Sequence, residues 1–464
     1  MRIEHDLLGQ RSVPAEAYYG IQTLRGMENF RISGVPLAHY PELIEALAMV
    51  KMAAARANRE CGQFSAEIAD GIENACNELI AGKLHEQFQL DMFQGGAGTS
   101  TNMNANEVIA NRALELMGKS KGDYEYCSPH DHVNCSQSTN DAYPSALHIA
   151  LALGNRKLLT ELEKLIESFR NKGQELNHIV KMGRTQLQDA VPMTLGQEFA
   201  AFARSLSDEV NTLIRVEGAL HEVNMGGTAI GTGLNAPLGF SERSTAQLAK
   251  ITGMPIHLAS NLVEATQDTQ AFVLYSSVLK SVSIKLSKIC NDLRLLSSGP
   301  RAGLHEINLP PMQPGSSIMP GKVNPVIPEV VNQVCFRVIG SDLTVTLAAE
   351  AGQLQLNVME PVIAACLLEA QTLLRNASRT LREHCIDGIT ANEDVCKMFL
   401  ERSIGTVTAL NPVIGYDQAT ALAAEALRTG KGIVELVREK GVLSEEQLAK
   451  VLDPAAMTGV RPPA

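Results

Sequence analysis

The sequence contains no tryptophan, and aromatic residues make up only 4% of its 464 residues. It also has no apolar run of roughly the eighteen residues that a membrane-spanning helix needs. Its first residues contain no apolar stretch of the length found in signal peptides. We therefore expect a cytoplasmic protein that has no membrane partner.

Positive charge is scarce as well. Lys and Arg together number 40 against 51 Asp and Glu, which gives a net charge of −11. Proteins that bind nucleic acid use basic side chains to neutralise phosphates, so this balance argues against a nucleic-acid partner. The nine cysteines are odd in number and never spaced as Cys-x-x-Cys, which predicts reduced thiols and no zinc site.

Long helices are the strongest structural signal. Apolar residues recur at spacings of three and four between Gln197 and Leu220, between Leu158 and Phe169, and between Leu279 and Leu296. This period lines one face of a helix, and stripes of this length are typical of bundles. Strands and helices do not alternate regularly, which argues against a doubly wound sheet. The predicted fold class is therefore all-α.

Two boundaries divide the chain into three predicted domains. Ser138-Thr-Asn-Asp141 has the pattern of a capping box that opens a long helical region. Beyond Ala391 the sequence contains only short amphipathic segments. We predict an N-terminal helical domain over 1–140, a central long-helix bundle domain over 141–391, and a small C-terminal helical domain over 392–464.

Four separated segments combine hydroxyls and amides with one cation, Lys322, in a composition that does not suit a core. Each segment alone is also compatible with a helix cap or a turn, where Ser, Thr and Asn are favoured regardless of function. Together they predict a pocket for a small dicarboxylate. The segments are 96–102, 137–140, 183–186 and 315–324.

Three nearby candidates are given structural roles. Arg184 more often makes a structural ion pair than it catalyses a reaction. His130 and His132 have the spacing of a metal pair, but no third ligand at a suitable spacing accompanies them in the sequence. We therefore predict a loop-capping role for these histidines and no metal site.

The segment Gly315-Ser-Ser-Ile-Met-Pro-Gly-Lys-Val-Asn-Pro325 resembles the signature loop of the aspartase/fumarase superfamily, whose members release fumarate by breaking a C–N or C–O bond. Other stretches resemble the family in the same order along the chain: 19–23, 98–104, 131–140 and 410–416. The resemblance implies an all-helical, three-domain homotetramer. In that family the central helices form a twenty-helix core, and each active site takes residues from three subunits.

Within the family, the chain resembles most the branch that deaminates L-aspartate, a carbon–nitrogen lyase. Gln186 stands where fumarases characteristically have a histidine that pairs with the residue corresponding to Glu329, and Glu360 lies where fumarases commonly have lysine. Class II fumarate hydratase is the main alternative. A lyase for a larger succinyl-type substrate, a catalytically silent structural relative and a pure binding module are less favoured.

The resemblance also implies roles for individual residues in an anti-elimination through an enediolate. Ser316 would take the proton as the general base. The β-carboxylate of the substrate would lie among Thr99, Ser138, Thr139 and the backbone N–H of Ser317. A serine hydroxyl is a poor base unless its ionised form is stabilised, and the sequence leaves that activation open.

The remaining predicted contacts hold the other end of the substrate. Lys322, Asn324 and Thr185 would bind the α-carboxylate, and Asn140 and Gln186 would contact the amino group that leaves as ammonia. The glycines around Ser316 indicate a loop that closes over the substrate. The reaction requires no cofactor, although some members of this branch respond to divalent cations.

Overall fold

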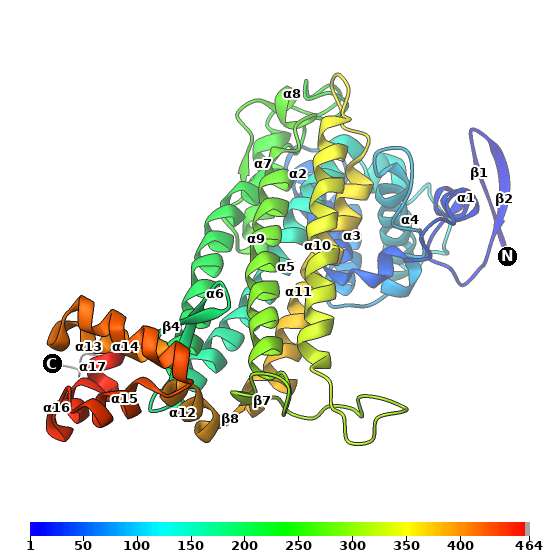
Figure 1. Ribbon diagram of the computed structural model, residues 1–464. Helices are drawn as coiled ribbons and strands as arrows, with labels where there is room; N and C mark the ends of the chain where they lie inside the picture. Colours follow the sequence, from blue (N-terminus) through cyan, green and yellow to red (C-terminus); the bar gives the residue numbers. More distant parts are fainter. Residues whose placement is uncertain (460–464) are drawn as a thin grey trace. The chain divides into compact units, whose positions relative to one another are not determined.

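The computed structural model describes residues 1–459, and helices dominate it (Figure 1). The described chain divides into two compact units. Unit 1 comprises Met1–Leu159, Asn211–Ser283 and Phe336–Arg375, and unit 2 comprises Thr160–Val210, Ile284–Cys335 and the residues from Asn376 onward. The all-α prediction is confirmed.

The longest helices agree with the predicted apolar stripes. The five longest in the described chain are α5 (Thr139–Glu175), α6 (Leu195–Glu217), α9 (Gln270–Leu296), α10 (Val326–Glu350) and α11 (Glu360–His384). The predicted stripe that ends at Leu220 runs slightly past its helix, because Gly218–His221 forms a 3₁₀ turn. Each of these helices has residues in both units.

The shorter helices flank them in the chain order. Those before and between the long helices are α1 (Ile21–Asn29), α2 (Pro41–Glu60), α3 (Ala66–Ile80), α4 (Thr99–Leu116), α7 (Phe240–Thr252) and α8 (Leu262–Ala265). Those after them are α12 (Glu393–Arg402), α13 (Val407–Ile414), α14 (Tyr416–Thr429), α15 (Ile433–Lys440), α16 (Glu445–Val451) and α17 (Pro454–Thr458).

Strands occur in the described residues only as two-stranded pairs. Three pairs are antiparallel: β1 (Arg2–Asp6) with β2 (Gly9–Val13), β3 (Val180–Thr185) with β4 (Gln188–Thr194), and β7 (Ile307–Asn308) with β8 (Thr390–Ala391). The fourth pair, β5 (Glu222–Val223) with β6 (His257–Leu258), is parallel. The β3–β4 hairpin carries two of the predicted site residues.

The core of unit 1 is built around the alanine-rich helix α2, which packs against α3 and α7, while α3 packs against α4. Small side chains let these helix backbones approach closely, and α2 buries most of its residues. A buried hydrogen-bond network also links the long helices within this unit. Tyr275 Oη donates to Asn155 Oδ1 over 2.9 Å, and Gln371 Nε2 donates to Leu151 O over 2.7 Å.

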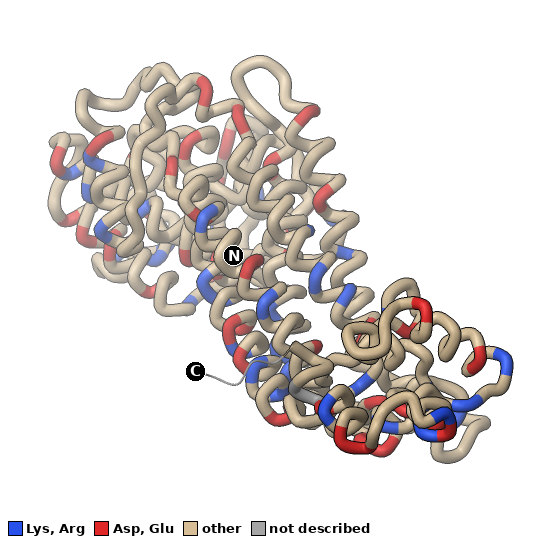
Figure 2. The backbone as a smooth tube through the Cα atoms, turned by 60° about the vertical axis from the view of Figure 1, so that its left-hand side comes forward, with Lys and Arg blue, Asp and Glu red and all other residues tan. Residues whose placement is uncertain are grey.

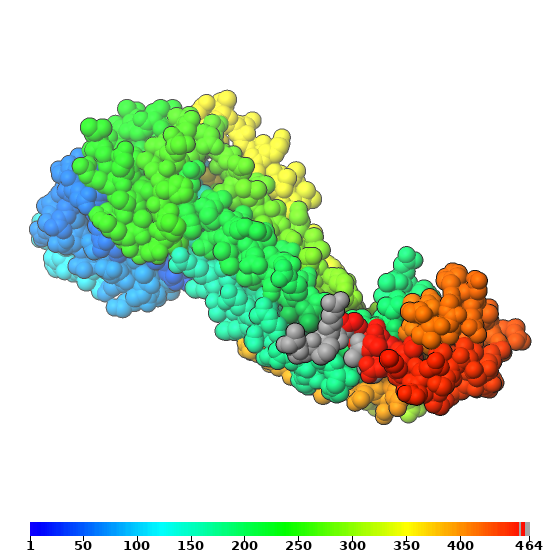
Figure 3. Space-filling model, turned by 90° about the vertical axis from the view of Figure 1, so that its left-hand side faces the viewer, coloured from blue at the N-terminus to red at the C-terminus, as the bar shows by residue number. Residues whose placement is uncertain are grey.

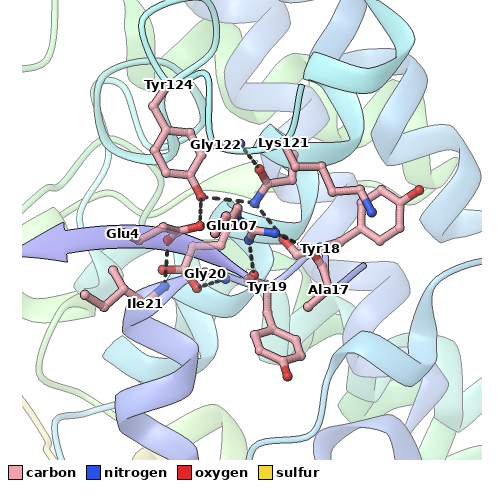
Figure 4. Close-up of polar contacts among 12 residues, drawn as sticks. Glu4, Ala17, Tyr18, Tyr19, Gly20, Ile21, Glu107, Lys121, Gly122 and Tyr124 are labelled. Carbon is pink, nitrogen blue, oxygen red and sulfur yellow. Dashed lines mark hydrogen bonds and ion pairs between the residues drawn. The ribbon is translucent and has the colours of Figure 1, made fainter. Parts of the chain in front are cut away.

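The N-terminal motif 19–23 is held by buried carboxylates (Figure 4). Glu107 accepts hydrogen bonds from the backbone N–H of Gly20 and Gln22, each over 2.8 Å, and from Thr23 Oγ1 over 2.6 Å. A Cβ on Gly20 would lie 2.6 Å from Glu4 Oε2, so a larger residue would displace this carboxylate. This motif therefore anchors helix α1 to α4, which is a structural role.

The C-terminal helices of unit 2, which are orange to red in Figure 3, enclose a small apolar core of their own. Its buried side chains are Leu410, Leu422, Ala426, Ile433, Leu436, Val437 and Leu448. Elsewhere in unit 2, α10 is tied to α9 because Asn332 Nδ2 donates to Ser287 Oγ over 2.9 Å. Phe169, Phe199 and Phe202 form an aromatic cluster between α5 and α6.

The division into three domains stays a prediction. Its two boundaries fall beside the start of α5 and the end of β8, and residues 460–464 of the third segment lie outside the described residues.

Lys and Arg are interspersed with Asp and Glu along the described chain (Figure 2). No helix among the described residues is long and apolar enough to cross a membrane.

Candidate active site

The predicted site residues are distributed between the two units. Unit 1 contains Thr99, Ser138, Thr139 and Asn140. Unit 2 contains Thr185 and Gln186 on the β3–β4 hairpin, and Ser316, Ser317, Lys322 and Asn324 on the loop before α10. Each group is described within its own unit.

Thr99 is the first residue of α4 and follows a glycine-rich turn. Gly98 has a φ of +88°, and a Cβ there would lie 2.6 Å from the ring of Tyr143. Glycine is therefore required for the chain to enter the helix along this path. The exposed side chain of Thr99 donates to Gly96 O over 2.7 Å, so its hydroxyl is oriented at the start of the helix.

The segment 138–141 opens α5 as predicted, with one difference. Ser138 N donates to Asp141 Oδ1 over 3.0 Å, which is one half of a capping box. Ser138 Oγ accepts from Asn140 N over 3.2 Å, where a complete box would use the N–H of Asp141. Because Ser138 Oγ acts as an acceptor in this bond, its hydrogen is available to another partner.

Thr139 is brought next to the first turn of α4 by Asn102. Asn102 Nδ2 donates to Thr139 Oγ1 over 3.1 Å, and it also donates to Asn134 Oδ1 over 3.1 Å. Asn134 Oδ1 also accepts from Lys51 Nζ over 3.1 Å. Burial lowers the pKa of Lys51 to about 7. The turns that carry Thr99 and Thr139 therefore share one buried polar network.

Asn140 is joined to the glycine-rich loop 225–235. Its Nδ2 donates to Ala229 O over 2.7 Å, which leaves its Oδ1 able to accept from an amine. Asp141 Oδ2 accepts from the backbone N–H of Gly226 over 3.1 Å and of Thr228 over 2.9 Å. Burial raises the pKa of Asp141 to about 7. This carboxyl group therefore holds the loop against the start of α5.

Thr185 and Gln186 lie at the tip of the β3–β4 hairpin in unit 2. Thr185 pairs with Gln188, so the turn consists of Gln186 and Leu187, with φ values of +54° and +61°. Two left-handed residues in succession match a type I′ turn, in which Asn and Gly are usual. The side chains of Thr185 and Gln186 are exposed.

Buried charges hold the base of this hairpin. Glu306 is fully buried, and it pairs with Lys181 Nζ over 2.7 Å and with Arg184 Nη1 over 2.6 Å. Lys181 also pairs with Glu198 over 2.6 Å. Burial opposes the charge of Lys181, but the two carboxylates outweigh it and raise the pKa of this lysine. The prediction that Arg184 makes a structural ion pair is confirmed.

Ser316 lies at the start of a loop closed by its own backbone. Gly315 N donates to Lys322 O over 2.7 Å, and Asn324 Nδ2 donates to Gly315 O over 2.8 Å. A Cβ on Gly315 would lie 2.5 Å from Lys322 O, so glycine is needed at the closure. The side chain of Lys322 is exposed, and one N–H of Asn324 is already used inside the loop.

One further sequence prediction is confirmed by local geometry. His132 Nδ1 accepts from Ser128 N over 2.8 Å, so this histidine caps the turn as expected. All nine cysteines lie within the described chain as free thiols.

Comparison with known proteins gives the family of the chain. The family profile described as "Lyase" matches residues 9–340, and one described as "Fumarase C C-terminus" matches residues 407–459. The chain is 61% identical over 461 residues to the aspartate ammonia-lyase of Pseudomonas aeruginosa, covering 99% of this chain and 97% of the relative. It is 56% identical to the aspartate ammonia-lyase of Escherichia coli K12, covering 97% and 94%.

Solved structures give the same grouping. A fumarate lyase:delta crystallin from Brucella melitensis bound to cobalt has a TM-score of 0.95 at 54% identity, covering 98% of this chain and 99% of that one. A class II fumarase from Schistosoma mansoni has a TM-score of 0.91 at 36% identity, covering 98% of each chain. The chain belongs to the aspartase/fumarase superfamily.

Several residues that shape the site in this superfamily member were not predicted from its sequence. Two of them are Lys51, which joins the polar cluster at the Thr139 turn, and Glu306, which pairs with both cations of the hairpin. The sequence predicts Asp141 only as part of a cap, whereas its carboxylate also accepts from two N–H groups of another loop. A charged residue in an otherwise apolar stretch, such as Lys51 in α2, is the sequence signal that could have indicated the first of these.

Proposed function

We propose that this chain is a carbon–nitrogen lyase that catalyses the reversible deamination of L-aspartate to fumarate and ammonia. The observation that carries the proposal is 61% identity, over 99% of the chain, to an aspartate ammonia-lyase. The class II fumarase relative is 36% identical at similar coverage. Gln186, at the exposed hairpin tip, supports the same choice because its amide oxygen can accept from a substrate amine.

The elimination removes a weakly acidic proton from the carbon next to the β-carboxylate, and Ser316 is the proposed base. Its Oγ accepts hydrogen bonds from the backbone N–H of Ile318 over 3.2 Å and of Met319 over 3.3 Å. Hydrogen bonds to an ionised oxygen favour that form. These two donors therefore support an ionised Ser316, which has lost its own proton to solvent and whose oxygen takes the proton from the substrate carbon.

The intermediate is an enediolate, which concentrates negative charge on the former β-carboxylate. Preorganised donors aimed at such charge stabilise the transition state. In the proposal these donors are Ser138, Thr139 and the N–H of Ser317, joined by Thr99 when its hydroxyl turns from Gly96 O toward the carboxylate. The free hydroxyl hydrogens of Ser138 and Thr139 support this role, because both oxygens already accept bonds from the protein.

The other end of the substrate is bound by its α-carboxylate and amine. Lys322 provides a cation for the carboxylate, and Asn324 and Thr185 provide hydrogen bonds. Asn140 and Gln186 accept from the ammonium group and remain with ammonia as it leaves on the face opposite Ser316. Closure of the loop 315–324 over the substrate would remove water from around Lys322, which is exposed in this structure.

We further propose a homotetramer in which three subunits contribute to each active site. The surface of α10 supports this assembly. Phe336, Leu343 and Leu347 follow one another at spacings of seven and four, and they are 62%, 62% and 60% exposed. An apolar stripe on a helix marks a buried interface.

We propose no obligatory cofactor, with divalent cations as possible activators. A cytoplasmic location and the absence of nucleic-acid or membrane partners stay predictions.

The test is release of fumarate, followed by ultraviolet absorbance with L-aspartate or L-malate as substrate. We expect fumarate from L-aspartate, and fumarate from L-malate alone would overturn the proposal. Each assay is run with EDTA and again with added Mg²⁺ or Co²⁺. Activity abolished by EDTA and restored by either ion would contradict the cofactor proposal.

Ser316→Ala tests the base in the same assay. The turnover number should fall at least about 100-fold, since general acid–base catalysis contributes roughly that much or more. Ser207→Ala on α6, outside the predicted site, is the matched control and should retain activity. Comparable activity in the two variants would remove Ser316 from its role.

A further inference from the structure

The β3–β4 hairpin has an unusual arrangement of charge at its base. In a regular strand, side chains three positions apart point to opposite faces. Lys181 and Arg184 are three apart, yet both reach the carboxylate of Glu306, over 2.7 and 2.6 Å. The pairing register shifts between Met182 and Arg184, and such irregularities increase the local twist of a strand.

The twist occurs at Gly183, where the hairpin cannot accept a side chain. A Cβ on Gly183 would lie 2.8 Å from the backbone oxygen of Val191 on the opposite strand. The strands therefore approach closely at Gly183, between the two cations that share the Glu306 carboxylate. Toward the tip, Arg184 is followed by Thr185 and Gln186, so the direction of the tip depends on the backbone at Gly183.

Glu306 is in turn fixed by its own backbone. Its carbonyl oxygen accepts from Asn392 N over 2.9 Å at the start of α12, and the ring of Phe399 on that helix lies 5.3 Å from the Arg184 guanidinium. Glu306 directly precedes β7, and the chain reaches Ser316 ten residues later. The hairpin, Glu306 and α12 all belong to unit 2.

A fully buried carboxylate with two cations has a particular energetic consequence. A buried ion pair adds little net stability, but removal of one partner leaves an unpaired buried charge. Two short ionic contacts to one rigid carboxylate also restrict strand β3 to a single arrangement. The tip itself contains two non-glycine residues at positive φ, which persists only where the surroundings enforce it.

We propose that Glu306 is a positioning residue for the reaction, and that through Lys181 and Arg184 it holds the hairpin so that Thr185 and Gln186 meet the substrate. This rests on the proposed function. Glu306 does not itself touch the substrate. Its removal should therefore weaken recognition of the amine and α-carboxylate that these two residues contact.

Glu306→Gln tests the proposal, because it keeps the shape of the side chain and removes its charge. A misplacement of about 1 Å can reduce the rate about 100-fold, so we expect kcat/KM for L-aspartate to fall about 10- to 100-fold. Glu198→Gln is the matched control. It removes the outer partner of Lys181 and leaves Glu306 in contact with both cations, so kcat/KM should stay within about twofold of wild type.

A second readout separates positioning from loss of folded protein. Succinate has both carboxylates of the substrate but no amine, so its inhibition constant depends less on Gln186. In Glu306→Gln the ratio of the L-aspartate KM to the succinate inhibition constant should rise severalfold. Partial unfolding would lower kcat and leave both constants unchanged, and an unchanged ratio with unchanged KM would overturn the proposal.

A second variant and a hydrogen-exchange measurement complete the test. If Glu306→Gln does not fold, Arg184→Lys keeps the charge but loses the planar guanidinium, and the same rise in the ratio is expected. Amide hydrogen exchange over 183–189 should be faster in Glu306→Gln than in Glu198→Gln, and equal rates would contradict positioning. Failure of wild type to act on L-aspartate would instead overturn the proposed function, and the exchange comparison would still test the hairpin.

Discussion

Asn102 Nδ2 donates a hydrogen bond to Thr139 Oγ1 over 3.1 Å, and this determines where the threonine hydroxyl can send its own hydrogen. The oxygen already accepts from the protein, so the hydrogen can be donated to a substrate carboxylate. The amide of Asn102 thus makes the Thr139 hydroxyl a hydrogen-bond donor toward the substrate.

Asn102→Asp should reverse the direction of the hydrogen bond between residue 102 and Thr139. An ionised carboxylate only accepts, so the Thr139 hydroxyl would turn its hydrogen toward residue 102 and away from the substrate. Hydrogen bonds to charged groups contribute about 1.5–3 kcal/mol, so KM for L-aspartate should rise about 10- to 100-fold. Steady-state kinetics measures the change.

Asn106→Asp provides the control for that substitution. Asn106 lies on the same helix, is equally buried, and donates to Asn134 Oδ1 over 3.1 Å. It therefore shares the stability penalty of a buried acid without contacting Thr139. The same rise in KM in both variants would mean that general destabilisation is responsible.

Lys322→Met should raise KM for L-aspartate. A desolvated ion pair contributes about 2–5 kcal/mol when one partner is removed, whereas an exposed pair contributes about 1 kcal/mol or less. Lys322 is exposed in this structure, so the size of the effect reports loop closure. We expect an increase of at least about 30-fold, which corresponds to the lower limit for a desolvated pair.

Lys285→Met, at an exposed lysine of α9, is the control for loss of one positive charge. Its KM should remain close to that of wild type. An increase of only about twofold in Lys322→Met would indicate a solvated lysine and would contradict closure over the substrate.

The long helices were predictable because their burial imposes a period on the sequence. The apolar residues of α9 from Leu279 to Leu296 face a core, and a 3.6-residue repeat is the direct consequence. The same logic located the start of α5, because Asp141 caps its N-terminus with a side chain selected by local geometry. Local rules suffice where the partner is a few residues away.

The hairpin could not be predicted in this way. Its turn lacks the glycine or asparagine that normally signals a two-residue connection, because Gln186 and Leu187 occupy the left-handed positions. The cations Lys181 and Arg184 find their partner at Glu306, which is more than a hundred residues away in the chain. Sequence patterns report periodicity and caps, whereas this contact depends on tertiary packing.

The turn predicts a separation between stability and activity. A left-handed conformation costs a non-glycine residue about 1–2 kcal/mol, while glycine adds about 0.5–1 kcal/mol of unfolded-state entropy. Leu187 is 71% exposed, so little packing is lost on truncation. Leu187→Gly should therefore raise the free energy of unfolding by about 0.5–1 kcal/mol and keep activity. The thermal unfolding midpoint should rise slightly as a result.

Gln186→Gly should gain stability for the same reason, but kcat/KM for L-aspartate should fall because the amide that accepts from the amine is removed. Calorimetry at equal protein concentration and the fumarate assay measure the two effects. Full activity in Gln186→Gly would exclude a contact between this side chain and the substrate.

Glu360 predicts a pH dependence of stability. It is 4% exposed at the first position of α11, and burial raises its pKa to about 8. A helix N-terminus favours the charged form by about 0.3–1 kcal/mol, less than the penalty implied by a shift of several pKa units at 1.36 kcal/mol each.

The sign follows from linkage. The Glu360 carboxyl has a pKa of about 8 in the folded state, above its ordinary value of 4.5. Its contribution to the free energy of unfolding is therefore full at low pH and is lost as pH rises from about 4.5 to 8. Glu360→Gln keeps the shape and removes the charge, so at pH 9 it should be more stable than wild type by more than about 1 kcal/mol. Below pH 4 the two proteins should differ little. Thermal unfolding at both pH values measures the contrast, with Glu350→Gln at the exposed end of α10 as the control. A variant that is less stable than wild type at pH 9 would mean that the carboxylate of Glu360 is bound to a partner that favours its charged form.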